Sequence, residues 1–275
     1  MNLGQLLTQM RTAPDLVERV TAWKVTPSRE GSFADFPPSV NPRLVDVLRS
    51  RGIKRLFTHQ ALAIKAAQRG ENFVVTPTAS GKTLCYNIPV PNSLLQDPHS
   101  RAIYLFPTKA LSQDQLDELH GLITALDVDI KTYTYDGDTP VNARKAIRAA
   151  GHIVITNPDM LHTGILPHHT KWVKLFENLK YVVIDEVHQY RGVFGSHLAD
   201  VIRRLKRICN WYGTKPIFIL SSATIANPEE LARKLIEEEV LLIDNDGSPQ
   251  GEQTLHLLQP PGGEQGTGYS ALLGP

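Results

Sequence analysis

The chain has 275 residues, and its 29 Lys and Arg against 28 Asp and Glu give a formal net charge of +1, so any contact with a polyanion must come from a local patch. This length suffices for a full hydrophobic core and suits one large α/β domain with an N-terminal arm, or two small domains. No window is long and apolar enough to span a membrane, and residues 1–10 lack the basic start and apolar run of a signal peptide, so we expect a soluble, cytoplasmic monomer without a membrane partner.

The first 51 residues are interpreted as an N-terminal arm with a helix. We expect a first helix around Asp15–Trp23, followed by a stretch rich in Pro, Ser and Gly. Asn41-Pro42 begins another helix. Thr58 is expected to cap a further helix that ends at Gly70 and leads into the next apolar run.

From Phe73 onward, short continuous apolar runs alternate with helical patterns. Such runs predict strands of a parallel sheet that is buried on both faces. Ligands of such sheets collect at the carboxyl ends of the strands. We therefore predict an α/β domain over residues 52–244. Its predicted strands begin near residues 73, 102, 130, 152, 181, 216 and 240.

The stretch Glu71–Asn87 places an apolar strand, a tight polar turn over residues 76–81 and a helix start in immediate succession. The first backbone N–H groups of a helix have no partner inside it, and together with the helix dipole they suit the phosphates of a nucleotide. The spacing matches the second half of the Walker A pattern, in which Lys82 faces the outer phosphates and Thr83 holds Mg²⁺. Thr76 stands where the full pattern has Gly, so a solvated turn stays an alternative.

Polar residues follow most of the predicted strands directly, and the acidic pair Asp185-Glu186 is the most informative of them. An Asp at the end of a buried strand beside a phosphate loop can hold Mg²⁺, and an adjacent Glu can orient and deprotonate the attacking water. The alternative is an acidic pair that marks where a strand meets solvent.

Five short segments on successive strand ends, TPTASGKT, PTKAL, TNPDML, DEVH and SSAT, resemble motifs I, Ia, Ib, II and III of the superfamily 2 helicases of the DEAD/DEAH-box type. More narrowly, DEVHQYRGVFGSHLADVIRRLKRIC and DGSPQGE resemble a branch of DNA helicases that includes the bacterial mitomycin-repair helicases and their RecQ-four-like fungal relatives. The resemblance implies a RecA-like P-loop NTPase domain with three layers. It also implies ATP and Mg²⁺ as cofactors and a single-stranded nucleic acid as partner, DNA rather than RNA.

The resemblance assigns a nucleotide role to each matching residue. Gln60 would read the adenine edge, although a solvated helix residue is the alternative there. Asp185 and Thr83 would hold the metal, and Glu186 would be the catalytic base beside Lys82. The loop residues that the resemblance implies for ATP binding are Thr78, Ala79, Ser80, Gly81, Lys82 and Thr83.

Further residues would couple the nucleotide site to the nucleic acid or contact the strand. His188 would act with Ser222, Ala223 and Thr224 as the coupling group, and a hydrogen-bonded core histidine is the alternative for His188. The implied contacts to the strand's backbone are Thr108, Lys109, Gly137, Thr156 and Asn157, whose hydroxyls, amides and helix starts suit phosphate oxygens.

Other polar segments stay open or receive a structural interpretation. Asp159 is expected to hold a loop or cap a helix, because a carboxylate does not bind a phosphate. Residues 189–194 could touch a strand or form a packed loop. The basic run over residues 203–207 is interpreted as a solvated helix face.

The cysteines, the remaining histidines and the tryptophans have no predicted part in the chemistry. Cys85 and Cys209 lie far apart without partners at metal spacing, so we expect buried thiols in a reducing compartment and no metal beyond Mg²⁺. Trp172 and Trp211 are expected to be core or interface residues.

The resemblance also implies a second RecA-like domain that would carry the arginine finger. Residues 245–275 are rich in Gly, Pro, Gln and Ser and are interpreted as a mobile linker or tail leading toward it. We therefore expect the chain to be an N-terminal fragment or truncated product with weak ATPase activity and no unwinding alone. The alternatives are a nucleotide- and nucleic-acid-binding module without turnover, and a small-molecule kinase.

Overall fold

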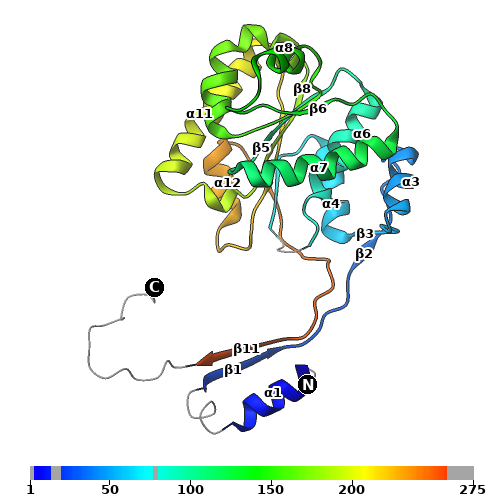
Figure 1. Cartoon of the computed structure of the whole chain (residues 1–275), viewed down its shortest axis with the longest axis vertical. Coiled ribbons are helices and arrows are strands. Elements are labelled where there is room, and N and C mark those ends of the chain that lie inside the picture. Colours follow the sequence, from blue (N-terminus) through cyan, green and yellow to red (C-terminus); the bar gives the residue numbers. More distant parts are fainter. Residues whose placement is uncertain (1–2, 14–19, 77–79, 259–275) are drawn as a thin grey trace. The chain divides into compact units, whose positions relative to one another are not determined.

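The computed structural model describes residues 3–13, 20–76 and 80–258. These residues belong to two compact units, one spanning Ser32–Ser248 and the other formed by the segments on either side of it. The boundaries predicted at residues 52 and 244 stay a prediction. Figure 1 shows the course of the chain and the labels of its elements.

Seven parallel strands form one sheet in the order β10-β4-β9-β8-β5-β7-β6. Each predicted apolar run is one of these strands, which confirms the predicted α/β fold. This spatial order differs from the order in the chain. Helical crossovers place β9 and β10 on the two sides of β4, and β7 and β8 on the two sides of β5. The strands are β4 Phe73–Val75, β5 Arg101–Leu105, β6 Thr132–Thr134, β7 Ile153–Thr156, β8 Leu179–Ile184, β9 Ile217–Ser221 and β10 Leu241–Ile243.

Helices cover both faces of this sheet (Figure 1). The α-helices are α1 Leu3–Thr12, α3 Pro42–Ser50, α4 Thr58–Arg69, α5 Leu84–Asn87, α6 Pro89–Gln96, α7 Lys109–Leu126, α8 Val141–Ala150, α9 Pro158–Met160, α10 Val173–Phe176, α11 Gly192–Trp211 and α12 Pro228–Ile236. The shorter turns are the π-helix η1 Leu161–Ile165 and the 3₁₀-helices η2 Leu166–Lys171 and η3 Val187–Gln189.

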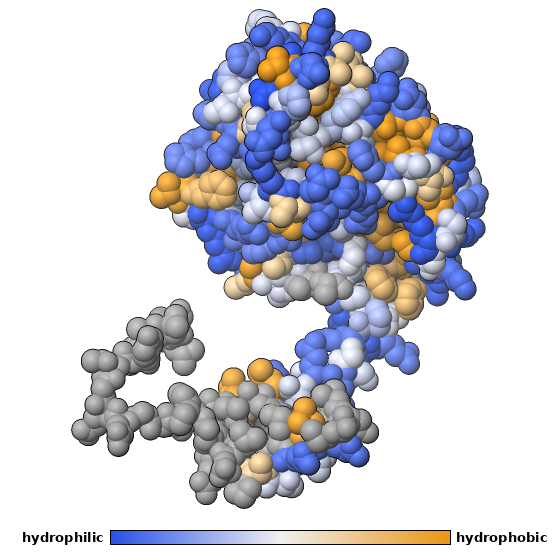
Figure 2. Space-filling model, in the orientation of Figure 1, coloured by the Kyte–Doolittle hydropathy of each residue, from blue (hydrophilic) through white to orange (hydrophobic). Residues whose placement is uncertain are grey.

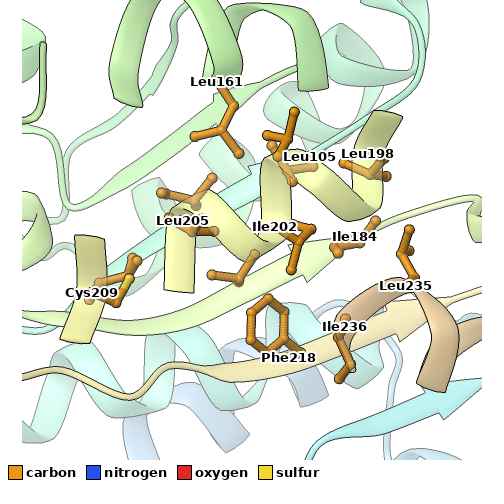
Figure 3. Close-up of a cluster of buried hydrophobic side chains, with 14 of the residues drawn as sticks. Leu105, Leu161, Ile184, Leu198, Ile202, Leu205, Cys209, Phe218, Leu235 and Ile236 are labelled. Atoms are coloured by element: carbon orange, nitrogen blue, oxygen red, sulfur yellow. The ribbon is translucent and has the colours of Figure 1, made fainter. Parts of the chain in front are cut away.

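Alternate residues of the central strands enter two different hydrophobic clusters. In β8, Val182 and Ile184 belong to the cluster that contains α11 and α12, whereas Val183 belongs to the cluster that contains α4 and α7. This is the two-residue period of a strand that is buried on both faces. Figure 3 shows the first cluster, in which Ile202 of α11 lies among side chains from the strands and from α12.

The helix α3 packs against α4 and α7 in a third buried cluster. Leu44 and Leu48 of α3 share a buried cluster with Ile64 of α4. Gly70 caps the C-terminal end of α4 with a left-handed φ of 76°, a conformation that glycine adopts readily. Its predicted cap is wrong by one residue, because Phe57 is the N-cap and the Gln60 side chain accepts the Phe57 N–H at 2.9 Å.

The terminal segments form an antiparallel pair of strands, β1 (Val20–Thr26) with β11 (Gln253–Leu258). The helix expected around Asp15–Trp23 is therefore wrong over Val20–Trp23, where β-branched residues favour a strand; residues 14–19 lie outside the described part. The linker predicted for residues 245–275 contains β11, so it is structured there, and residues 259–275 lie outside the description. β2 (Phe33–Ala34) and β3 (Leu56–Phe57) form a separate antiparallel pair within the larger unit.

The surface seen in Figure 2 is mostly hydrophilic over the larger unit, with several separate hydrophobic areas. In the described ranges, no helix has the length and apolar character needed to cross a membrane. Trp172 is buried, as expected of a core residue, whereas Trp211 is 81% exposed. Both cysteines are buried free thiols, and burial raises the pKa of each to about 12.

Candidate nucleotide site and nucleic-acid face

The strand order sorts the predicted motifs into two neighbouring groups. β4, β9 and β8 are adjacent, so the phosphate loop, residues 222–224 and residues 185–188 follow three neighbouring strands. β5, β7 and β6 are the next three strands, and the predicted nucleic-acid residues follow those. All seven strands are parallel, so both groups lie along the same edge of the sheet and meet where β8 pairs with β5.

The phosphate loop is held by the first turn of α4. The side-chain amide of Gln60 donates to the Gly81 carbonyl at 3.0 Å, and Nε2 of His59 lies 3.1 Å from the carbonyl oxygen of buried Ser80. Gly81 has a φ of 71°, and a Cβ at this position would lie 2.9 Å from the Gln60 amide nitrogen. The left-handed φ favours glycine here, whereas the Gln60 side chain could move away from a Cβ.

The helix after the loop begins two residues later than expected. Lys82 and Thr83 form a turn, and α5 is a single turn that starts at Leu84. The Cys85 N–H donates to the Lys82 carbonyl at 2.8 Å, so the chain is already tightly wound before the helix starts. The remaining predicted loop residues, Thr78 and Ala79, lie outside the described residues, and their phosphate contacts stay predictions.

Lys82, which follows the phosphate loop, contacts the segment after β9 directly. The Lys82 ammonium donates to the Ser222 carbonyl, and the Ser222 N–H donates to the Val75 carbonyl of β4 at 2.9 Å. Two predicted motifs that lie far apart in the sequence therefore share one hydrogen-bonded junction beside the phosphate loop.

Asp185 is a buried carboxylate that is surrounded by donors. Its Oδ1 accepts the Glu186 N–H at 2.9 Å and the Ser221 hydroxyl, and its Oδ2 lies 3.3 Å from the Tyr86 hydroxyl. Burial, with the Asp185 charge adding to it, raises the pKa of Tyr86 well above its ordinary value, so this hydroxyl keeps its proton. The Tyr86 hydroxyl also donates to Oε1 of Gln115 in α7 at 3.0 Å. One carboxylate and one hydroxyl fit Mg²⁺, which takes its other ligands from water and phosphates.

A short chain of hydrogen bonds links the predicted base to the segment after β9. Oε2 of Glu186 lies 3.1 Å from Nε2 of His188, and Nδ1 of His188 accepts the Ala223 N–H at 3.0 Å. Because Nδ1 accepts a hydrogen bond, the neutral ring carries its hydrogen on Nε2 and donates it to Glu186. Glu186 itself has a φ of 54°, a left-handed conformation that is uncommon outside glycine. The ring of His188 joins two predicted motifs, and its coupling role stays a prediction beside the alternative of a hydrogen-bonded core histidine.

The predicted nucleic-acid residues lie at the ends of β5 and β6. Thr108 is the N-cap of α7, and its hydroxyl oxygen accepts the Leu111 N–H at 3.4 Å. Lys109 forms an exposed ion pair with Asp138, which follows β6. Gly137 directly precedes Asp138 in that loop, and a Cβ added to Gly137 would meet no atom within 4 Å. The two strand ends are thus joined across β7 by a charge pair at the surface.

The two predicted contacts at the end of β7, where Thr156 is the last residue of the strand and Asn157 follows it, differ from each other. Thr156 is buried, and its hydroxyl donates to the Tyr135 carbonyl at 2.6 Å, so it holds two strand ends together. The Asn157 side chain caps α9 by accepting the Met160 N–H at 2.8 Å. Asp159 lies exposed in the first turn of the same helix, whose cap is Asn157, so its expected role in holding a loop stays a prediction. Direct strand contacts by Thr156 and Asn157 stay predictions.

Comparison with known proteins identifies the family. The DEAD/DEAH box helicase domain matches residues 57–231, which is more than half of the chain. The chain belongs to the DEAD/DEAH box helicase family. The predicted RecA-like α/β fold is thereby confirmed, and the chain is similar to proteins named as ATP-dependent helicases.

The chain spans about a quarter to a third of the length of the two curated relatives described here. It is 57% identical over 245 residues to an uncharacterised ATP-dependent helicase, YprA, of Bacillus subtilis, and these residues cover 89% of this chain and 33% of that protein. It is 39% identical over 241 residues to the ATP-dependent helicase hrq1 of Schizosaccharomyces pombe, covering 86% of this chain and 23% of that one. The DUF1998 helicase MrfA, in a crystal structure with DNA, matches with a TM-score of 0.91 and 53% identity over 95% of this chain and 37% of that chain.

Packing in the helicase domain describes two further polar segments, residues 189–194 and the basic run over residues 203–207. In the loop after η3, Tyr190 is buried against Phe194 with ring centroids 5.2 Å apart, whereas Phe194 is 41% exposed. On α11, Arg203 pairs with Glu237 and Lys206 pairs with Glu238, so half of the basic run is bound to acidic partners.

A basic pocket beside the nucleic-acid residues was not predicted from the sequence. Its cations come from α8 and η2, so they are scattered along the chain and form no motif. The Arg144 guanidinium is used internally, since it donates to the Thr139 carbonyl at 2.9 Å and packs over the Tyr135 ring. Arg148, His168 and Lys171 remain as the other basic side chains of the lining. The pocket, called the basic pocket below, is lined by Tyr135, Arg144, Arg148, Met160, Thr163, Gly164, His168 and Lys171.

No cluster of three or more His, Cys, Asp or Glu with metal-binding geometry occurs within residues 3–13, 20–76 and 80–258.

Proposed function

We propose that this helicase domain binds ATP with Mg²⁺ at the phosphate loop, hydrolyses it with Glu186 as base, and contacts the backbone of single-stranded DNA along the ends of β5, β7 and β6. The observation that carries the proposal is the hydrogen-bonded chain from Glu186 through His188 to Ala223, beside the junction of Lys82 with Ser222. It joins a base, a phosphate-binding lysine and the segment after β9 in one site.

The residues around Asp185 would hold the metal. Thr83 lies directly after the phosphate loop and Asp185 directly after β8, and each would supply one oxygen ligand to the ion. Mg²⁺ bound there would neutralise charge on the phosphates during transfer to water. Lys82 would add a second positive charge from the other side of the phosphate loop, and its present hydrogen bond to Ser222 would be exchanged for phosphate oxygens.

Glu186 is oriented for proton abstraction. Its backbone N–H is fixed by Asp185 and its side chain by His188, so neither the main chain nor the carboxylate is free to rotate. The side chain is a quarter exposed, which gives a water molecule access to it. A base that is held in one orientation lowers the entropic cost of reaching the transition state.

The nucleic-acid part of the proposal is supported by position and charge. The Thr108 and Asn157 helix starts and the basic pocket lie beside one another at the ends of adjacent strands, and they contact phosphates without reading bases. The structure of MrfA with DNA, at 53% identity, favours DNA over RNA. The sequence pattern over residues 1–10 and the lack of a long apolar window are the basis on which we propose a cytoplasmic monomer.

The proposed cycle also needs a second RecA-like domain. An arginine finger from such a domain raises the rate by about 10³ or more. We therefore expect weak ATP hydrolysis and no unwinding of a tailed duplex by these 275 residues alone. Unwinding by the purified chain would contradict this part of the proposal.

Two substitutions test the assigned roles. Lys82→Ala should abolish ATP binding, because the ammonium faces the phosphates in the ground state. Glu186→Gln should bind ATP as the unaltered protein does and lose hydrolysis, because only the transition state uses the base. Binding is measured by titration with a fluorescent ATP analogue, and turnover by phosphate release with and without oligo-dT.

Lys215→Ala is a matched control for the lysine, since Lys215 is 85% exposed and lies at the other end of the strands. Equal loss of binding in Lys82→Ala and Glu186→Gln would overturn the roles. Phosphate transfer to a metabolite in place of water would favour a kinase, and binding without hydrolysis even when the second domain is supplied would favour a binding module.

A further inference from the structure

His59 is fully buried at the start of α4, and both of its ring nitrogens bond to segments far away in the sequence. Nε2 lies 3.1 Å from the Ser80 carbonyl oxygen in the phosphate loop. Nδ1 accepts the Gly247 N–H at 3.2 Å. The ring also stacks on Phe57, with centroids 5.9 Å apart and 17° between the planes. One rigid ring therefore bridges the phosphate loop and the residues that follow β10.

The bridge fixes the tautomer of the ring. Since Nδ1 accepts a hydrogen bond, Nε2 carries the hydrogen and donates it to Ser80. Burial lowers the pKa of His59, although the Ser80 carbonyl and the Asp246 charge oppose the effect, and the ring is neutral at neutral pH. A neutral imidazole with one donor and one acceptor matches a carbonyl on one side and an N–H on the other.

Gly247 is clamped in its own right. Its carbonyl accepts the Ser32 N–H at 2.8 Å, and the Ser32 carbonyl accepts the Thr58 N–H at 3.0 Å. A Cβ on Gly247 would lie 2.4 Å from the Thr58 hydroxyl oxygen and 2.8 Å from the Thr58 nitrogen. Only glycine fits this approach. The clamp therefore joins Gly247 to the residue that immediately precedes His59, one residue before the compact unit ends at Ser248.

We propose that His59 is a positioning residue that couples the phosphate loop to the segment Asp244–Ser248, through which the chain leaves the compact unit. The inference rests on the proposed function, because it takes the phosphate loop to be the ATP site. Phosphates that engage the loop N–H groups change the orientation of the Ser80 peptide. The ring is buried and stacked, so it cannot absorb that change alone, and the displacement passes to the Gly247 amide on its other side.

Three substitutions separate the two sides of the bridge. The amide of Asn reaches the position of Nδ1, so His59→Asn keeps the Gly247 contact and loses the Ser80 contact. The longer Gln reaches the position of Nε2, so His59→Gln keeps the Ser80 contact and loses Gly247. His59→Ala loses both. His99→Ala is the matched control, because it removes an imidazole whose residue is exposed on the turn before β5.

The readout is amide hydrogen exchange of residues 244–248 with and without Mg²⁺ and a non-hydrolysable ATP analogue. In the unaltered protein and in His99→Ala, the analogue should change the exchange rate of the Gly247 amide by about fivefold or more, the range of an ordinary coupling between sites. All three His59 variants should lose this response. His59→Gln should still bind the analogue within about twofold of the unaltered protein, whereas His59→Asn should bind it less well, since only the former holds Ser80.

Gly247→Ala tests the bridge without altering the ring. The added methyl group should separate Gly247 from Thr58 and abolish the change in the Gly247 exchange rate on analogue binding. If His59→Ala does not fold, Gly247→Ala and His59→Asn together test the proposal. A Gly247 response that survives in His59→Ala or Gly247→Ala overturns the proposal. The proposal is also overturned if the unaltered protein binds the analogue and the exchange rate of its Gly247 amide does not change. No binding at all would instead overturn the proposed function, so the two failures are told apart.

Discussion

His188 holds Glu186 in place by a 3.1 Å contact from Nε2 to the carboxylate, while its Nδ1 takes the N–H of Ala223. The ring thus ties the predicted base, which follows β8, to the segment that follows the neighbouring strand β9. Any movement of that segment changes where the carboxylate points. The proposed orientation of the base and its proposed communication with the neighbouring strand end would therefore be carried by the same side chain.

Replacement of His188 should slow ATP hydrolysis without preventing ATP binding. In His188→Ala the Glu186 carboxylate loses its donor, and we expect kcat to fall by about tenfold or more, short of the 10²–10⁴ that loss of a general base costs. His188→Asn keeps an acceptor near Ala223 but does not reach Glu186, so it should behave like Ala. Steady-state phosphate release at several ATP concentrations separates kcat from KM. A raised KM with unchanged kcat would show that His188 acts in binding only.

Loss of two cations from the basic pocket should weaken DNA binding equally for every sequence. Each phosphate contact to a single strand contributes about 0.7 to the slope of log affinity against log salt, so Arg148→Ala with Lys171→Ala should lower the slope by about 1.4. The measurement is fluorescence anisotropy of labelled oligo-dT and mixed-sequence oligonucleotides between low and moderate salt. Lys215→Ala removes an 85% exposed lysine and should leave the slope unchanged. An unaltered slope in the double variant would remove the pocket from the nucleic-acid face.

The sequence predicted the strands and their chemistry better than it predicted long-range pairing. Continuous apolar runs identify strands buried on both faces, and the polar residues after them mark one edge of the sheet, as Lys82 and Asp185 illustrate. The order of those strands depends on packing between segments, which local patterns do not contain. For the same reason the sequence analysis did not predict β11 or the role of His59, whose contact with Gly247 spans 188 residues.

Acidification should destabilise the fold through buried histidines. Burial lowers the pKa of His59 and of His152 from the ordinary value of 6.5, and Arg101 lowers that of His152 further. Below pH 6.5 the unfolded chain takes up protons at these residues while the folded protein does not, so the free energy of unfolding falls as the pH falls. Each group contributes a slope of at most about 1.4 kcal/mol per pH unit.

Urea titrations between pH 5 and pH 8 measure this dependence, within about the range where histidines titrate. His59→Gln removes one titrating group, so its stability should decline less steeply below neutral pH than that of the unaltered protein. An identical pH profile in His59→Gln would mean that His59 is protonated equally well in the folded and unfolded chain.

Truncation of a buried side chain on α11 should destabilise the domain far more than truncation of an exposed one on the same helix. Ile202 is fully buried between the sheet and α12, where Figure 3 shows it among apolar side chains, so Ile202→Ala leaves a cavity and should cost about 2–5 kcal/mol. Trp211 is the matched control, because it is 81% exposed at the end of the helix and Trp211→Ala should change stability by less than about 0.5 kcal/mol. Both values come from urea unfolding monitored by circular dichroism. Similar losses for the two variants would mean that α11 does not close the core over β8 and β9. The motifs after those two strands would then need another support, because α11 begins four residues after His188.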